Sequence, residues 1–461
     1  MKTAKKLLSA ALALLLALSF TPGTVYSADF DLAPYSSIGL FIYEETTGTV
    51  LLEKNAHTRL YPGSITKIMT TITALDYMDN MEEKVRVTSA ALGLVGPNSS
   101  TANLSAGEEL TFRQLIYATL IPSGNDAAIV TAVACGEKIL GKKASVGECY
   151  SAFLEKMNEK SLQMGLTESH WANADGYDNT QNYSTAFDIV TLGRAASKMS
   201  LITETVGNLS VKQTTNTATH EWKSTNVLKY ETLPAYYGGG GANPYYSPLV
   251  TGMKTGYTKM GQKCFLMTAT DGKMNIIGAF LNVPDDNKME IWQKADSVLD
   301  YVFKGHAIVS LITDENRSAT YSVANPSVFQ SGQLAIYARE DLTLCLDKDK
   351  INKYGYMTTL SADTVAAEED GVLRLKRDIV PGDVIGQLVF FCDGDIIAKT
   401  DMITAEKFDI FGKSDIVMIA VFVTAIGIFI VLMSMLQKKK LKKKKLRRKK
   451  NAAKSSKNAR V

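Results

Sequence analysis

Two short, mostly apolar runs lie close to the start of the folded chain, with a polar stretch between them. The segments 38–43 and 50–53 are rich in aliphatic residues and flank the turn-forming stretch 44–48, a pattern typical of a β-hairpin. After Pro62-Gly63 the apolar residues switch to helical spacing, and those at 65, 68, 69, 72 and 75 share one stripe. The pattern therefore predicts a hairpin and then an amphipathic helix that begins close to Ser64.

The rest of the chain divides into a helix-rich part, a mixed part and a strand-rich part. After residue 306, short strand-like runs between turn signals, without long helical periodicity, predict a separate small β domain. Before it, helical spacing predicts helices at 111–120, 126–140, 150–164, 186–199 and 292–303, and alternation predicts neighbouring antiparallel strands at 253–255, 264–270 and 275–281.

Two longer apolar runs lie near the ends of the chain. The run 7–20 follows three lysines and precedes a small residue at Ser27, which favours a secretory signal cleaved after Ser27 over an uncleaved anchor. The run 416–436 carries no charge and, at about 1.5 Å per residue, is long enough for a hydrocarbon core of about 30 Å. We expect this second run to span a membrane.

Charge is distributed unevenly and gives the span a direction. Of 51 Lys and Arg residues, fourteen lie in 437–461 and three precede Ala28, which leaves 34 against 47 acidic residues in 28–436, a balance of −13. This acidic body argues against a nucleic-acid-binding surface. The basic run directly after the span predicts a cytoplasmic stop-transfer tail that also contacts anionic lipid, with the body extracytoplasmic.

Cysteine usage gives no sign of a metal or redox motif. None of the five cysteines forms C-x-x-C, and for Cys135 and Cys149 both a disulfide and buried free thiols stay open. The patterns together predict a signal peptide at 1–27, a mixed catalytic domain at 28–305, a β-rich domain at 306–408, a transmembrane helix at 416–436 and a basic tail at 437–461.

Candidate chemistry begins with Ser64 and Lys67, which form the one S-x-x-K in the chain. Residues three apart on a helix share a face, so a hydroxyl nucleophile would lie beside an amine base. A lysine acts as a base only when its pKa falls toward neutrality, which burial and the positive charge of Lys254 would bring about. No serine lies in a G-x-S-x-G frame, so a Ser-His-Asp hydrolase has no support.

A second candidate, Ser123-Gly-Asn125, falls in an expected loop between two helices. The Ser123 hydroxyl could relay a proton between Lys67 and a leaving nitrogen, and Asn125 could hold Lys67 or a substrate amide. The same S-x-N pattern at Ser224-Thr-Asn226 is interpreted as a cleft edge or a plain loop.

A third candidate is Lys254-Thr-Gly256, expected on an edge strand beside the nucleophile. Lys254 and Thr255 would bind a substrate carboxylate, and Gly256 would let the acyl group approach the backbone closely. The N–H groups of Ser64 and Tyr257 would then form an oxyanion hole. The Gly-rich stretch 237–248 is interpreted as a loop at the rim.

In this order the three motifs resemble the penicillin-binding protein and serine β-lactamase superfamily. The stretches 123–128, 173–177, 183–188 and 251–258 are similar to low-molecular-mass, serine-type D-alanyl-D-alanine carboxypeptidases, a resemblance that covers about 35–303. The stretch 382–386 is similar to that family's C-terminal domain. The resemblance implies an α+β fold: an antiparallel sheet flanked by helices with a helical subdomain, then a small all-β domain. The family often attaches by a C-terminal amphipathic helix, so the expected transmembrane helix at 416–436, apolar all round, is a departure from it.

The resemblance also implies a function. The enzyme would remove the terminal D-Ala from peptidoglycan stem peptides through a Ser64 ester, be acylated by β-lactams, and need neither metal nor cofactor. Catalysis would fall to Ser64, Lys67 and Ser123, and substrate binding to Asn125, Lys254, Thr255, Gly256 and Tyr257. A D,D-endopeptidase, a β-lactamase and a non-catalytic cell-wall scaffold are the alternatives.

Overall fold

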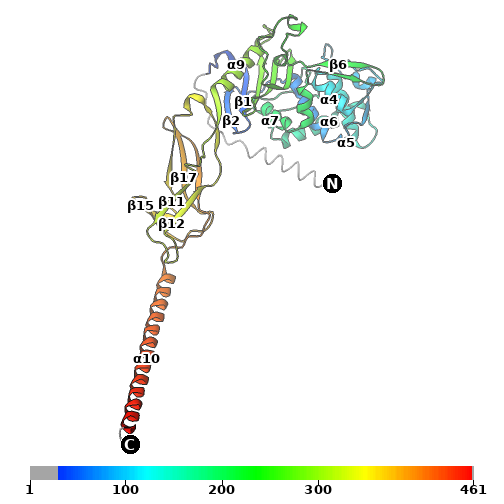
Figure 1. Cartoon of the computed structure of the whole chain (residues 1–461). Coiled ribbons are helices and arrows are strands. Elements are labelled where there is room, and N and C mark those ends of the chain that lie inside the picture. The colour runs from blue at the N-terminus through cyan, green and yellow to red at the C-terminus, as the bar shows by residue number, and fades with distance from the viewer. Residues whose placement is uncertain (1–29, 459–461) are drawn as a thin grey trace. The chain divides into compact units, whose positions relative to one another are not determined.

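The computed structural model describes residues 30–458, so the predicted signal peptide lies outside the described residues. The chain forms two compact units, drawn in Figure 1. Of the described residues, the first unit contains 30–309 and Thr343–Lys353, and the second contains Ser310–Leu342 and 354–458.

The first unit contains the predicted antiparallel sheet. Its five strands lie in the order β2-β1-β9-β8-β7, so β7 is an edge strand as expected. The predicted hairpin and the three alternating runs are confirmed. The strand bounds are β1 (Gly39–Glu44), β2 (Thr49–Lys54), β7 (Val250–Thr258), β8 (Gln262–Thr270) and β9 (Asn275–Val283).

Hydrophobic cores cover both faces of this sheet, because successive side chains of a strand point to opposite sides. On β1, Phe41 and Tyr43 belong to the core that includes α7 (Ala186–Ser197). Leu40 and Ile42 belong to the other core, which α9 (Glu290–Gly305) covers. This two-sided burial explains why the strands are nearly continuous apolar runs.

A cluster of helices, with α4, α5 and α6 together in Figure 1, forms the helical part of the first unit. Capping boxes start α4 at Thr111 and α6 at Ser145, which satisfies backbone N–H groups that lack a helical partner. Besides α7 and α9, the helices described between residues 30 and 309 are η1 (Ala33–Tyr35), η2 (Gly63–Ile65), α2 (Thr66–Leu75), α3 (Ser89–Leu92), α4 (Phe112–Leu120), α5 (Asn125–Leu140), α6 (Val146–Gln163), α8 (Ser200–Gly207), η3 (Val227–Lys229) and η4 (Ala235–Tyr237).

Two short two-stranded sheets went unpredicted, because their side chains are largely exposed and carry little hydrophobic pattern. These are β3 (Lys84–Arg86) with β4 (Glu109–Thr111), and β5 (Ser210–Thr214) with β6 (Thr219–Lys223). Cys135 and Cys149 are both buried free thiols, which decides between the two states left open by the sequence.

The second unit holds a seven-stranded sheet in the order β14-β17-β18-β12-β11-β16-β15 and the long helix α10 (Lys413–Asn458). The first unit also contains the pair of β10 (His306–Ser310), up to Val309, with β13 (Thr343–Asp347), which η5 (Lys348–Lys350) follows. The sheet strands are β11 (Ser318–Val323), β12 (Gln333–Ala338), β14 (Tyr354–Leu360), β15 (Val365–Glu369), β16 (Val372–Leu375), β17 (Val384–Cys392) and β18 (Asp395–Ile403). The predicted all-β character is confirmed.

Candidate active site

Ser64 lies where the chain turns into its first long helix. Gly63 has φ +56°, a left-handed conformation that glycine adopts without strain, and η2 then runs directly into α2. Ser64 is half-buried, whereas Lys67 in the first turn of α2 is fully buried. The side chain of Lys67 therefore reaches Ser64 from inside the protein.

Three oxygen atoms surround the Lys67 ammonium group. Its Nζ donates to Ser64 Oγ over 2.8 Å, to Asn125 Oδ1 over 2.7 Å and to the backbone oxygen of Asp175 over 2.6 Å. All three hydrogen bonds of an ammonium are thus satisfied inside the protein. When the group loses a proton, its lone pair can accept a hydrogen bond from the Ser64 hydroxyl without any movement of heavy atoms.

Burial makes this loss of a proton feasible near neutral pH. Desolvation lowers the pKa of Lys67 to about 8, although the nearby carboxylates of Asp175 and Asp126 act in the opposite direction. The sequence had suggested that Lys254 would help to lower the Lys67 pKa. In the structure, the causes at Lys67 are burial and the two acids, and it is the pKa of Lys254 that falls well below its usual value, through burial and then the charge of Lys67.

The loop Ser123-Gly124-Asn125 is rigidly held at the start of α5. Ser123 is buried with φ +65°, and Gly124 N donates to Ala118 O over 3.0 Å. Asn125 reaches Lys67, as one of its two expected roles requires. Within residues 30–458 the Ser123 hydroxyl makes no hydrogen bond to Lys67, so its relay role stays a prediction.

The third motif lies on β7 against η2. A Cβ atom on Gly256 would lie 2.4 Å from Pro62 O and 3.3 Å from Ser64 N. One on Gly63 would lie 3.0 Å from Tyr257 N. The backbones of the two segments therefore touch, and the close approach that Gly256 permits here is to η2, whereas the sequence had suggested an approach by the acyl group.

Lys254, Thr255 and the neighbouring segment 224–226 complete this edge of the site. Lys254 is buried and donates to Thr255 O over 3.0 Å, and the hydroxyls of Thr255 and Thr225 lie 2.5 Å apart. The Ser224-Thr-Asn226 segment thus borders β7, since Asn226 Nδ2 also donates to Gly252 O over 3.3 Å. Of its two interpretations, this position favours the cleft edge.

The loop 173–177 is a part of the site whose role the sequence did not reveal. Asn173 closes the loop by accepting from Gly176 N over 2.7 Å and donating to Tyr177 O over 2.9 Å. This turn aims the Asp175 carbonyl at Lys67. The Asn-x-x-Gly spacing is a turn signal that could have indicated the loop, but not the carbonyl contact.

Gly176 gives a testable consequence of this packing. It has φ +77°, and a Cβ there would lie 2.0 Å from Gly63 O and 2.9 Å from Ser64 N. Gly176→Ala should therefore displace the loop from η2, lower the thermal midpoint and slow acylation at least tenfold. Gly272→Ala is the control, because Gly272 has φ +87° but open space around its Cβ position, and it should cost only about 1–2 kcal/mol of backbone strain. Equal acylation rates in the two variants would contradict the packing argument.

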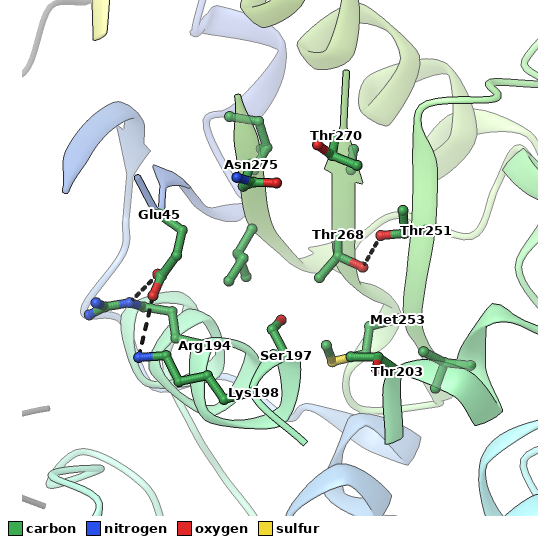
Figure 2. A pocket seen from close by; sticks show the side chains of 14 residues that line it. Glu45, Arg194, Ser197, Lys198, Thr203, Thr251, Met253, Thr268, Thr270 and Asn275 are labelled. Carbon is green, nitrogen blue, oxygen red and sulfur yellow. Dashed lines mark hydrogen bonds and ion pairs between the residues drawn. The ribbon is translucent and has the colours of Figure 1, made fainter. Parts of the chain in front are cut away.

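A separate pocket of about 320 Å³ lies further along β7, where Thr251 and Met253 line it (Figure 2). Glu45 there pairs with Arg194 Nε at 2.6 Å and with Lys198 at 3.5 Å. None of the eight site residues predicted from the sequence lines this pocket. Among the described residues, no group of three or more His, Cys, Asp or Glu side chains could hold a metal ion.

Comparison with known proteins matches both units. Residues 33–285 match the D-alanyl-D-alanine carboxypeptidase family of peptidases, and residues 302–409 match the C-terminal domain of penicillin-binding protein 5. The D-alanyl-D-alanine carboxypeptidase DacF of Bacillus subtilis is 27% identical over 86% of this chain and 95% of its own length. A D-alanyl-D-alanine carboxypeptidase of a Streptomyces strain is 32% identical over 53% of this chain and 80% of its own length.

Solved structures agree with these matches. A single-residue mutant of a Streptomyces DD-transpeptidase is 30% identical, with a TM-score of 0.50 over 58% of this chain and 97% of that one. Penicillin-binding protein 5 of Haemophilus influenzae shares the fold, with a TM-score of 0.57 over 80% of this chain and 96% of that one at 22% identity. With its family match covering more than half of its length, this chain belongs to the D-alanyl-D-alanine carboxypeptidase family and is a serine peptidase of that specificity.

Proposed function

We propose that Ser64 is the nucleophile of this carboxypeptidase and that Lys67 is its general base. The observation that carries the proposal is the 2.8 Å hydrogen bond between Lys67 Nζ and Ser64 Oγ, made by a lysine whose burial lowers its pKa to about 8. Nucleophile and base are within direct proton-transfer distance. In acylation, Ser64 Oγ bonds to the carbonyl carbon of the D-Ala–D-Ala peptide while its proton passes to Lys67.

The oxyanion that forms needs hydrogen-bond donors at a fixed position. We assign this role to the backbone N–H groups of Ser64 and Tyr257, which the tight contact of η2 with β7 supports. The C–N bond then breaks, and the proton that Lys67 accepted passes through Ser123 to the amine of the leaving D-Ala. Water hydrolyses the Ser64 ester, and the freed hydroxyl recovers its proton.

The substrate carboxylate would bind Lys254 and Thr255, with Thr225 beside them. Burial, and after it the charge of Lys67, holds the pKa of Lys254 well below its usual value. A carboxylate bound beside Lys254 would raise this pKa, because an opposite charge favours the ammonium form. Binding of the substrate carboxylate would thus act against both causes that lower the pKa of Lys254.

The alternatives differ in how the ester is released or used. A β-lactamase needs a carboxylate that positions water for deacylation. Glu204, an acid that could be considered for this role, is exposed on α8, where its backbone oxygen accepts from Asn208 Nδ2. This exposed position favours a carboxypeptidase, which β-lactams acylate and from which the acyl group is released only slowly. An endopeptidase would use the same groups on cross-linked peptides, and a scaffold would not acylate.

We also propose where the enzyme works. Helix α10 includes a segment long and apolar enough to cross a membrane, with a mean hydropathy of 3.1 and no burial inside the protein. The basic residues after the span favour a cytoplasmic C-terminus that contacts anionic lipid, with the catalytic domain facing peptidoglycan outside. The proposed domain bounds are 28–305 and 306–408, with the span at 416–436 and the tail at 437–461.

The pH dependence of acylation tests the assignment of Lys67. Only the neutral amine accepts the Ser64 proton, so the acylation rate constant should rise with pH and level off above about 8. The measurement is single-turnover acylation by a fluorescent penicillin from pH 6 to 10, with D-Ala release from a D-Ala–D-Ala pentapeptide alongside. A rate that is flat below pH 8, or that falls as pH rises, would contradict Lys67 as the base.

A further inference from the structure

We infer that the base of the β unit rests on the lipid surface through an apolar collar formed by Val328, Phe329 and Phe411. The inference rests on the proposal that α10 spans a membrane, and it adds a second contact, made by loops of the folded β unit. These three side chains are 49%, 69% and 45% exposed, although each is large and apolar. Exposed apolar groups that lie together usually mark an interaction surface.

The collar lies directly beside the first turn of α10. Asp415 is buried, and its carboxylate accepts from Ser327 Oγ over 2.5 Å, from Val328 N over 3.1 Å and from Gly412 N over 2.8 Å. One carboxylate thus ties the loop after β11 to the start of the helix. Val328 cannot move away from α10 without breaking these charge-assisted hydrogen bonds.

Backbone pairing fixes Phe411 in the same place. Phe411 N donates to Asn325 O over 3.0 Å, and Ser327 N donates to Asp409 O over 2.9 Å. The segment that leads into α10 is therefore held against the loop that carries Val328 and Phe329. The collar and the start of the helix form one connected structure within the second unit.

The depth of the collar matches the interfacial layer of a bilayer. Ile416, the first residue of the apolar run, donates its N–H to Gly412 O, so one helical turn of about 5.4 Å separates Gly412 from the hydrocarbon boundary. The polar interface on each side of the hydrocarbon core is about 5–8 Å thick. Aromatic side chains favour this layer, and the exposed Lys413 can reach lipid phosphates from it.

Lipid is the occupant that this position favours, because the collar continues the surface of the spanning helix. The apolar residues that follow Asp415 on α10, beginning with Ile416 and Val417, are 57% and 61% exposed. A bilayer that covers them reaches the neighbouring collar without any further partner. The β unit would then stand on the membrane at a fixed angle, which a flexible tether would not impose.

An environment-sensitive fluorophore on a single introduced cysteine tests the contact. The five native cysteines are buried, so Phe329→Cys and, as a control, Ile396→Cys can be labelled selectively in the full chain. Ile396 is 66% exposed at the start of β18, at the other end of a strand about 30 Å long. The labelled chains are placed in vesicles of phosphatidylethanolamine and phosphatidylglycerol that contain a lipid with a nitroxide near its headgroup.

The nitroxide lipid should quench the probe at 329 several-fold more than the probe at 396, and aqueous iodide should show the reverse order. Equal quenching at both positions, while the chain still floats with the vesicles, would overturn the collar and leave the anchor intact. Failure to float would instead overturn the spanning role of α10. Protection of the 329 probe that depends on protein concentration in detergent would assign the surface to a second copy of the chain, which also overturns the lipid contact.

Discussion

Replacing Ser64 with alanine is expected to reduce D-Ala release from a D-Ala–D-Ala pentapeptide by about 10⁴- to 10⁶-fold. The proposed mechanism passes through an ester of this hydroxyl, and the base Lys67 contacts it directly at 2.8 Å. The variant should fold normally, since Ser64 is half-buried and alanine removes a single oxygen atom. Steady-state D-Ala release with the purified full chain measures the effect.

Ser297→Ala is the matched control, because its hydroxyl only donates to Gln293 O within α9. This variant should keep full activity. Residual activity of Ser64→Ala within tenfold of the unchanged protein would refute the serine mechanism. Complete inactivity of the unchanged protein as well as of Ser64→Ala would instead favour the scaffold alternative.

Lys67→Met should slow acylation by about 10²- to 10⁴-fold, the range expected for the loss of a general base. Methionine has a similar volume and no charge to bury, which offsets the cost of leaving Asn125 Oδ1 and Asp175 O without their donor. The free energy of unfolding should therefore change by only about 1–3 kcal/mol. Single-turnover acylation and thermal unfolding, measured on the same samples, separate the two effects.

Lys229→Met is the control for this substitution. Burial lowers the pKa of Lys229 to about 8 as well, but its Nζ donates to the backbone oxygens of Val206 and Gly207, away from any serine hydroxyl. A lowered lysine pKa alone should not support acylation, so Lys229→Met should acylate at nearly the normal rate. Similar losses in both variants would show that the Lys67 effect is structural.

Much of this site follows from local sequence patterns. The spacing of Ser64 and Lys67 predicts a shared helical face. In the structure, Lys67 Nζ donates to both Ser64 Oγ and Asn125 Oδ1. Strand alternation predicts that Lys254 lies on a strand, and the sheet order shows that this strand, β7, is an edge strand. Side-chain identity and periodicity suffice for these contacts because each motif lies on, or at the end of, a regular element.

The remaining contacts depend on backbone atoms, which any residue type possesses. The Asp175 carbonyl that accepts from Lys67 has no signature in the residue at that position, and the turn that aims it is formed by Asn173 and Gly176. The return of the chain from the second unit to the first is equally hard to predict. Cys345 on β13 belongs to the core beneath α9, although the segments before Thr343 and after Lys353 belong to the second unit.

The most direct test of the central claim is to locate the covalent adduct after reaction with penicillin. Intact mass and peptide mass spectrometry of the unchanged protein should give one penicilloyl group per chain, on the peptide that contains Ser64 and on Ser64 itself. The same treatment of Ser64→Ala should give no adduct. An adduct on another residue, or an equal yield of adduct in Ser64→Ala, would contradict the account.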